Sequence, residues 1–223
     1  GTNRRNTTSK KTRMPKMTYC WGSSKTEGNA TQKQLLGGKG ANLAEMTSIG
    51  LPVPPGFTIP TTMCEAYYAQ NNRMPRGLDN ATVKAIRQVE KETGKQFGSE
   101  TDPLLVSVRS GAAVSMPGMM DTVLNLGLTD NAVQGMIELT GNERFAWDAY
   151  RRLINMFGDV VMGMDHEDFE HEFSAVKKKY GVELDTELSA KGLAEVCSRY
   201  KKVYRLHVGS EFPQDPYKQL SHA

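Results

Sequence analysis

The chain has 223 residues, of which 38% are hydrophobic and 24% charged, so it can bury the core of one large domain or two small ones. Its formal net charge is +3, but residues 1–16 hold six basic and no acidic residues, which leaves 22 basic and 25 acidic residues, or −3, for the rest. This mildly acidic body argues against a nucleic-acid-binding surface. No apolar run reaches roughly 18 residues, which argues against an integral membrane protein. Three widely spaced cysteines argue against a disulfide scaffold or zinc ribbon and favour a reducing compartment.

The first half of the chain has the pattern of a short tail followed by an α/β subdomain. Residues 1–16 are basic and polar, which predicts a disordered tail. Their composition is typical of the end of an organelle transit peptide and fits a vector-derived extension equally well. Residues 17–129 alternate short apolar runs with amphipathic segments. We expect strands at residues 17–21, 57–59, 104–109 and 123–126, and helices at residues 41–49, 61–69 and 80–96.

The second half is predicted to be a helical subdomain over residues 130–210, followed by a polar end at 211–223. Apolar residues recur at spacings of three and four, as in helices that bury one face. Asp130 and Asn142 are expected to cap the first two helices, and Gly141 to end the first. Further helices are expected at 166–180 and 188–206. The predicted fold class is therefore α/β (α+β).

The first candidate for chemistry is a glycine-rich turn that contains Lys39. Gly37, Gly38 and Gly40 surround this lysine just before a predicted helix. Free backbone amides, a helix N-terminus and a lysine can together hold phosphate oxygens. The spacing matches neither a Walker A motif nor GxGxxG, and an ordinary glycine turn with a surface lysine explains it too.

The second candidate is Arg109, at the end of the apolar run 104–109. An arginine at the carboxyl end of a buried strand lies where open α/β sheets bind ligands, and its planar guanidinium suits bidentate contact with phosphate. The alternative is an arginine in a structural ion pair.

The third candidate is the methionine-rich segment 116–122, which holds Gly118, Asp121 and Thr122. Exposed methionines are unusual unless a partner covers them, and a flexible loop here could close over a nucleotide. Alternatively, the methionines fill the seam between the two halves. His166 and His171 are five residues apart, whereas helical metal ligands favour a separation of four, so no metal site is predicted.

The three candidates together resemble one family, the nucleotide-binding domain of pyruvate, phosphate dikinase. The resemblance covers nearly all of residues 17–220, and the methionine-rich loop separates this family from the phosphoenolpyruvate synthases. It rests on LLGGKGANLAEM at 35–46, VPPGFT at 53–58, SVRSGA at 107–112, MPGMMDTVLNLG at 116–127, NERFAWD at 142–148 and FPQDP at 212–216.

The resemblance implies the N-terminal portion of an ATP-grasp-like domain with a helical subdomain. Full enzymes of the family interconvert ATP, phosphate and pyruvate with AMP, pyrophosphate and phosphoenolpyruvate, through a phosphohistidine on a swivelling central domain and a pyruvate site on a distant barrel. By motif, Lys39 and Arg109 would contact the ATP phosphates, while Gly118, Asp121 and Thr122 would belong to the loop that closes on them. Lysine, arginine and Mg²⁺ would supply the charge neutralisation that phosphoryl transfer needs.

The resemblance also predicts what this chain lacks. The family's Mg²⁺-binding carboxylates, phosphohistidine domain and barrel would lie outside it, so we expect a part that is inactive alone and binds ATP weakly, and a homodimer at full length. The family leaves cytoplasm and plastid stroma both open. Alternative interpretations are a non-catalytic module that acts through protein contacts and the equivalent domain of a phosphoenolpyruvate synthase.

Overall fold

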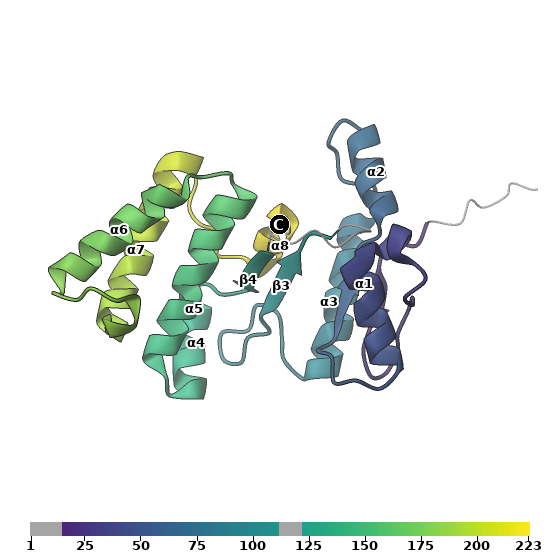
Figure 1. The fold of residues 1–223 in the computed structure, drawn as a ribbon, viewed down its shortest axis with the longest axis horizontal. Coiled ribbons are helices and arrows are strands. Elements are labelled where there is room, and N and C mark those ends of the chain that lie inside the picture. Colours follow the sequence, from purple (N-terminus) through teal and green to yellow (C-terminus); the bar gives the residue numbers. More distant parts are fainter. Residues whose placement is uncertain (1–14, 112–121) are drawn as a thin grey trace, which may run out of the picture.

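The structure is a computed structural model that describes residues 15–111 and 122–223. Figure 1 shows helices α1, α2 and α3 at one end of an elongated molecule and helices α4 to α7 at the other. The strands β3 and β4 lie between the two groups, with the short helix α8 beside β4. The mixture of helices with small sheets confirms the expected mixed α/β class at this coarse level.

The N-terminal region packs three helices around a small sheet. Strands β1 (Tyr19–Trp21) and β2 (Gly56–Thr58) pair antiparallel. Helices α1 (Lys33–Ser48), α2 (Thr61–Ala69) and α3 (Leu78–Thr93) complete the region. Three apolar side chains, Met17, Met63 and Leu78, form a small core there. Cys64, on α2, is exposed.

The sequence predicts a glycine turn followed by a helix at residues 41–49, and helix α1 differs from this prediction in where it starts. It begins earlier, at Lys33, and is interrupted by Gly37, whose φ of 73° and ψ of 164° are not helical. Glycine reaches this region without a steric clash between a β-carbon and the backbone. The turn therefore exists as a kink within a longer helix.

Strands β3 (Val106–Arg109) and β4 (Thr122–Leu126) form a second antiparallel pair. The expectation of a buried strand is wrong for β3, because its residues alternate between half-buried and exposed. Within the described residues the sheet has only these two strands, which run antiparallel, and one face of β3 is open because Ser107 and Arg109 are exposed on it. The general rule for the carboxyl ends of parallel strands consequently does not apply to Arg109.

The helical region follows the predicted order. It comprises α4 (Asp130–Thr140), α5 (Glu143–Met156), a π-helical turn η1 (Phe157–Val161), α6 (His166–Lys179), a 3₁₀ turn η2 (Asp185–Glu187) and α7 (Ala190–Val208). Asn142 caps α5 as predicted, and Gly141 ends α4 with a φ of 66°. The cap of α4 is Thr129 rather than Asp130, because the Thr129 hydroxyl accepts from the Ala132 amide.

The main core joins the helical region to β4 and to α3. Helix α5 is its centre, packed on both β4 and α7. Its largest fully buried members are aromatic or branched side chains, among them Ile86, Leu126, Tyr150, Leu153, Phe157, Phe169, Phe173, Tyr200, Tyr204 and Phe212. Among the described residues no helix is both long and apolar enough to cross a membrane.

The segment 211–223 is more ordered than a polar end would be. Phe212 is buried. Its ring centroid lies 5.4 Å from the ring centroid of Phe157 and 5.5 Å from that of Tyr204. Helix α8 (Pro216–His222) follows, capped by the Asp215 carboxylate. Its Gln219 side chain is fully buried although it is polar. The segment thus belongs to the main core.

Candidate functional site

Arg109 and Thr122 are brought together by the β3–β4 pair. They are direct partners in the antiparallel register, at the end where the two strands lead to residues 110–121. Partners in such a register have side chains on the same face of the sheet. Arg109 is exposed and Thr122 is half-buried. The other two predicted loop residues, Gly118 and Asp121, lie outside the described residues.

The alternative of a structural ion pair for Arg109 finds no support in the described part of the chain. The Arg109 guanidinium forms neither a hydrogen bond nor an ion pair with residues 15–111 or 122–223, in contrast to Arg151, which binds Asp148 at 2.9 Å. A solvated guanidinium without a carboxylate partner is free to bind an external anion. Its role in ligand binding stays a prediction.

Lys39 follows the kink in α1. The second part of this helix lies close to β2. A β-carbon added to Gly40 would be only 2.6 Å from the Thr58 hydroxyl oxygen, so the contact leaves no room for a side chain there. Ala41 and Ala44 of the same helix are buried. Lys39 itself is half-buried, and its ammonium group has no hydrogen-bond or ion-pair partner among the described residues.

The structure does not join Lys39 to the hairpin. Over the described ranges, no hydrogen bond or ion pair links Lys39 to Arg109 or Thr122, and Figure 1 shows α1 and β3 in different parts of the molecule. Convergence of both cations on one polyphosphate therefore stays a prediction.

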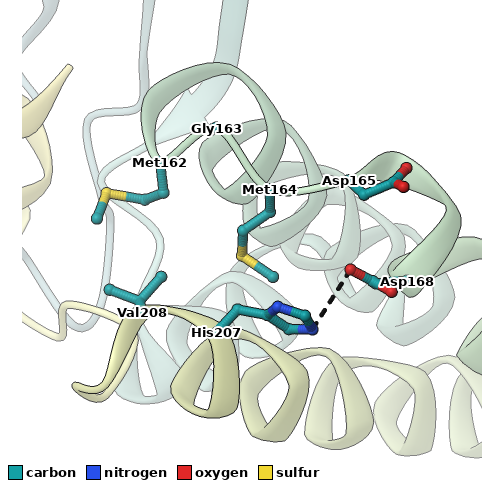
Figure 2. Close-up of a pocket in the computed structure, with 7 residues that line it drawn as sticks. All are labelled: Met162, Gly163, Met164, Asp165, Asp168, His207 and Val208. Carbon is teal, nitrogen blue, oxygen red and sulfur yellow. Dashed lines mark ion pairs between the residues drawn. The ribbon is translucent and has the colours of Figure 1, made fainter.

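A cavity of about 530 Å³ lies elsewhere, beside the C-terminal end of α7 (Figure 2). Its lining includes Met164 and an ion pair between His207 Nε2 and Asp168, 3.3 Å apart. None of the predicted phosphate-binding residues contributes to it. In residues 15–111 and 122–223, no three His, Cys, Asp or Glu side chains are grouped as a metal site requires.

Two polar clusters that the sequence analysis did not identify hold the framework together. In the first, the Glu92 carboxylate on α3 accepts hydrogen bonds from the Ser23 hydroxyl at 2.6 Å and from the Ser24 hydroxyl and amide. These bonds, that of the Ser23 side chain foremost, lower the pKa of Glu92 to about 2. These bonds anchor the loop after β1 to α3. Because Glu92 lies far along the sequence from Ser23 and Ser24, no local sequence pattern indicates that they meet.

The second cluster surrounds Asp130. Its carboxylate accepts from the Tyr150 hydroxyl at 2.7 Å and pairs with Lys201 at 2.8 Å. Gln214 accepts from the Asp130 amide and donates to Tyr150. Burial raises the pKa of Tyr150 and raises that of the nearby Cys197 thiol to about 12, so both remain protonated near neutral pH. The cluster fixes the start of α4 against α5, α7 and the segment before α8.

A mixed α/β framework in which one cation follows a glycine kink and another lies on a hairpin, both without a partner within the described ranges, is consistent with the class of nucleotide-binding domains. Comparison with known families makes the assignment specific. A family model described as "Pyruvate phosphate dikinase, AMP/ATP-binding domain" matches residues 33–81 and 73–207, and the chain belongs to this family.

Similar proteins come from plants, bacteria and protists. The chain is 52% identical over 205 residues to the chloroplastic pyruvate, phosphate dikinase of Mesembryanthemum crystallinum. The matched region covers 92% of this chain and 22% of that protein. It is 53% identical over 207 residues to the pyruvate, phosphate dikinase of Rhizobium meliloti (93% of this chain, 23% of that protein). The corresponding enzyme of Giardia intestinalis is 52% identical over 188 residues (84% and 21%). The chain thus spans less than a quarter of the length of these relatives.

Proposed function

We propose that this chain is the ATP-binding part of a pyruvate, phosphate dikinase and contributes one wall of an ATP-grasp-like nucleotide site. The observation that carries the proposal is the pairing of Arg109 with Thr122 at the base of the segment 110–121. A guanidinium without a partner in the described part of the chain and a hydroxyl-bearing side chain share one face there, a combination suited to phosphate oxygens.

Lys39 and the loop residues complete the proposed site. Lys39 supplies a second positive charge after the Gly37 kink, while Gly118, Asp121 and Thr122 belong to the segment that closes over the phosphates. These groups position the polyphosphate and neutralise its charge, which is the main requirement of phosphoryl transfer. In the whole enzyme the reaction would be the interconversion of ATP, phosphate and pyruvate with AMP, pyrophosphate and phosphoenolpyruvate.

Mg²⁺ would accompany ATP and neutralise its phosphate charge when bound. Within the described ranges no carboxylate cluster fits this ion. No Mg²⁺ ligand is therefore assigned to residues 15–111 or 122–223.

The proposal is tested by titrating the ¹⁵N-labelled chain with Mg-ATP and following amide chemical shifts, which detect affinities as weak as millimolar. Lys39→Ala and Arg109→Ala are each expected to weaken binding about tenfold or more, because a hydrogen bond to a charged group contributes about 1.5–3 kcal/mol. Lys33→Ala, on the same helix as Lys39, and Arg87→Ala, an exposed arginine of α3, are the matched controls and should bind like the wild type.

Three results would overturn the assignment. One is a chain that does not respond to Mg-ATP. Another is unchanged affinity in both Lys39→Ala and Arg109→Ala. The third is an equal loss in the two control variants, which would indicate non-specific attraction of the anion.

A further inference from the structure

The pairing of β3 with β4 contains an irregularity that determines which residue faces Arg109. Val106 pairs with Leu126, but Val108 pairs with Val123. Two steps along β3 thus correspond to three steps along β4, so β4 carries one extra residue opposite Ser107. This is the arrangement of a β-bulge, in which two residues of one strand oppose one of the other.

Asn125 is the residue of the bulge with an unusual backbone. Its φ is 61°, in the left-handed region, and it is the only non-glycine residue of the described strands with a positive φ. Asparagine tolerates this region better than most residues. Its Nδ2 donates a hydrogen bond of 3.2 Å to the Ala149 carbonyl oxygen on α5. The bulge is therefore anchored to the central helix of the main core.

The bulge determines which residues of β4 face the core and which lie on the open face. In a regular antiparallel pair, the register set by Val106 and Leu126 would continue until Arg109 lay opposite Val123. Alternation from Leu126 would then turn Thr122 toward the core and Val123 outward. With the extra residue, Leu126 and Val123 are both buried, at 0% and 2% exposure. Thr122 instead lies on the open face, opposite Arg109.

We propose that Asn125 is a positioning residue for the phosphate site, holding the bulge that places Thr122 beside Arg109 on the open face of the hairpin. This inference rests on the proposed function, since Arg109 and Thr122 are its phosphate-binding pair. Asn125 acts through the backbone and through Ala149, at the strand end away from residues 110–121.

The test uses three substitutions of the full 223-residue chain and two measurements. Asn125→Gly keeps access to the left-handed region but loses the anchor to Ala149. Asn125→Asp keeps the shape but replaces the donor with an acceptor. Asn125→Val disfavours the positive φ, because a β-branched residue is strained there. Nuclear Overhauser contacts between the backbone protons of Arg109 and Thr122 measure whether the two residues are still paired. Mg-ATP titration measures the affinity of the phosphate site.

In Asn125→Val we expect the Arg109–Thr122 contact to be lost and Mg-ATP to bind about tenfold or more weakly, as in Arg109→Ala. Asn125→Gly should keep the contact and bind within a few-fold of the wild type, while Asn125→Asp should be intermediate. The triple variant Asn125→Val with Arg109→Ala and Thr122→Ala should bind no more weakly than Arg109→Ala with Thr122→Ala, because residues that act through one interaction are not additive. Asn72→Val, which replaces an exposed asparagine with a φ of 60° outside the hairpin, should change neither measurement.

The proposal is overturned if Asn125→Val keeps the Arg109–Thr122 contact, or if it weakens binding further in the background that lacks the side chains of both Arg109 and Thr122. If Asn125→Val does not fold, Asn125→Asp decides, and wild-type values of both the contact and the affinity in that variant overturn the proposal. Failure of the proposed function is distinguishable, because Arg109→Ala would then bind Mg-ATP like the wild type while the register measurement still reported on Asn125.

Discussion

Arg109 and Thr122 are direct antiparallel partners on β3 and β4, and they bound the segment 110–121 at its two ends. The two ends of the segment that carries the methionine-rich motif therefore meet at one place, next to the Arg109 guanidinium, which has no partner among residues 15–111 and 122–223. Thr122 is held in place because β4 is packed on α5 in the main core.

Replacing Arg109 with lysine tests whether charge alone is sufficient at this position. Arg109→Lys keeps the positive charge but loses the planar guanidinium that binds phosphate with two parallel hydrogen bonds. We expect Mg-ATP affinity between those of the wild type and Arg109→Ala, measured by amide chemical-shift titration. Affinity equal to that of the wild type would show that Arg109 acts as a point charge and not by bidentate contact.

Gly37→Ala should destabilise the kink of α1. A φ of 73° with a ψ of 164° is essentially restricted to glycine, and a side chain there costs about 1–3 kcal/mol. Urea unfolding should show this loss of stability. Asn42→Ala, at an exposed position on the same helix, is the control and should stay within about 0.5 kcal/mol of the wild type. Equal stability of Gly37→Ala and the wild type would contradict the observed backbone.

Gln219→Leu should destabilise the attachment of α8 to β4. The Gln219 side chain accepts from the Gly127 amide at 2.9 Å and donates to the Leu128 and Pro213 carbonyls, both at 2.8 Å. Leucine would leave two buried backbone groups and the half-buried Pro213 carbonyl without this partner, at about 1–3 kcal/mol for each buried group. We expect a loss of about 3 kcal/mol or more in the free energy of unfolding.

The control for Gln219 is Lys218→Leu, the same substitution at an exposed position one residue earlier. It should leave the stability nearly unchanged. A similar stability for the two leucine variants would mean that the buried hydrogen bonds contribute little.

Glu92 should make stability depend on pH in the acidic range. Its pKa is lowered from 4.5 to about 2 in the folded chain, so its contribution is complete above about pH 4.5 and disappears as the pH falls toward 2. Glu92→Gln should be less stable than the wild type near neutral pH, and the difference should shrink through this window. Urea unfolding as a function of pH measures it. Glu65→Gln, on the exposed surface of α2, is the control and should have the stability of the wild type at every pH. A stability difference between Glu92→Gln and the wild type that does not change with pH would refute the explanation.

Much of the fold was predictable because it depends on local signals. Asn142 and Gly141 delimit their helices as their residue types require, and the apolar spacing of three and four located α5 to α7. The Asp215-Pro216 pair is an equally local start signal for α8. It went unrecognised because the surrounding residues are polar. The buried state of β3 was predicted wrongly, because an apolar run does not reveal which elements cover the two faces of a strand.

The sequence by itself determined the family, since its glycine turn, arginine motif and methionine-rich segment lie in contiguous stretches that can be compared directly. It also determined most helices, since the period of 3.6 residues is a local property of the chain. Only the tertiary structure decided which side chains meet. The left-handed Asn125, the pairing of Arg109 with Thr122 and the burial of Gln219 all depend on contacts between distant segments. Such contacts arise from the packing of whole elements, which no window of neighbouring residues encodes.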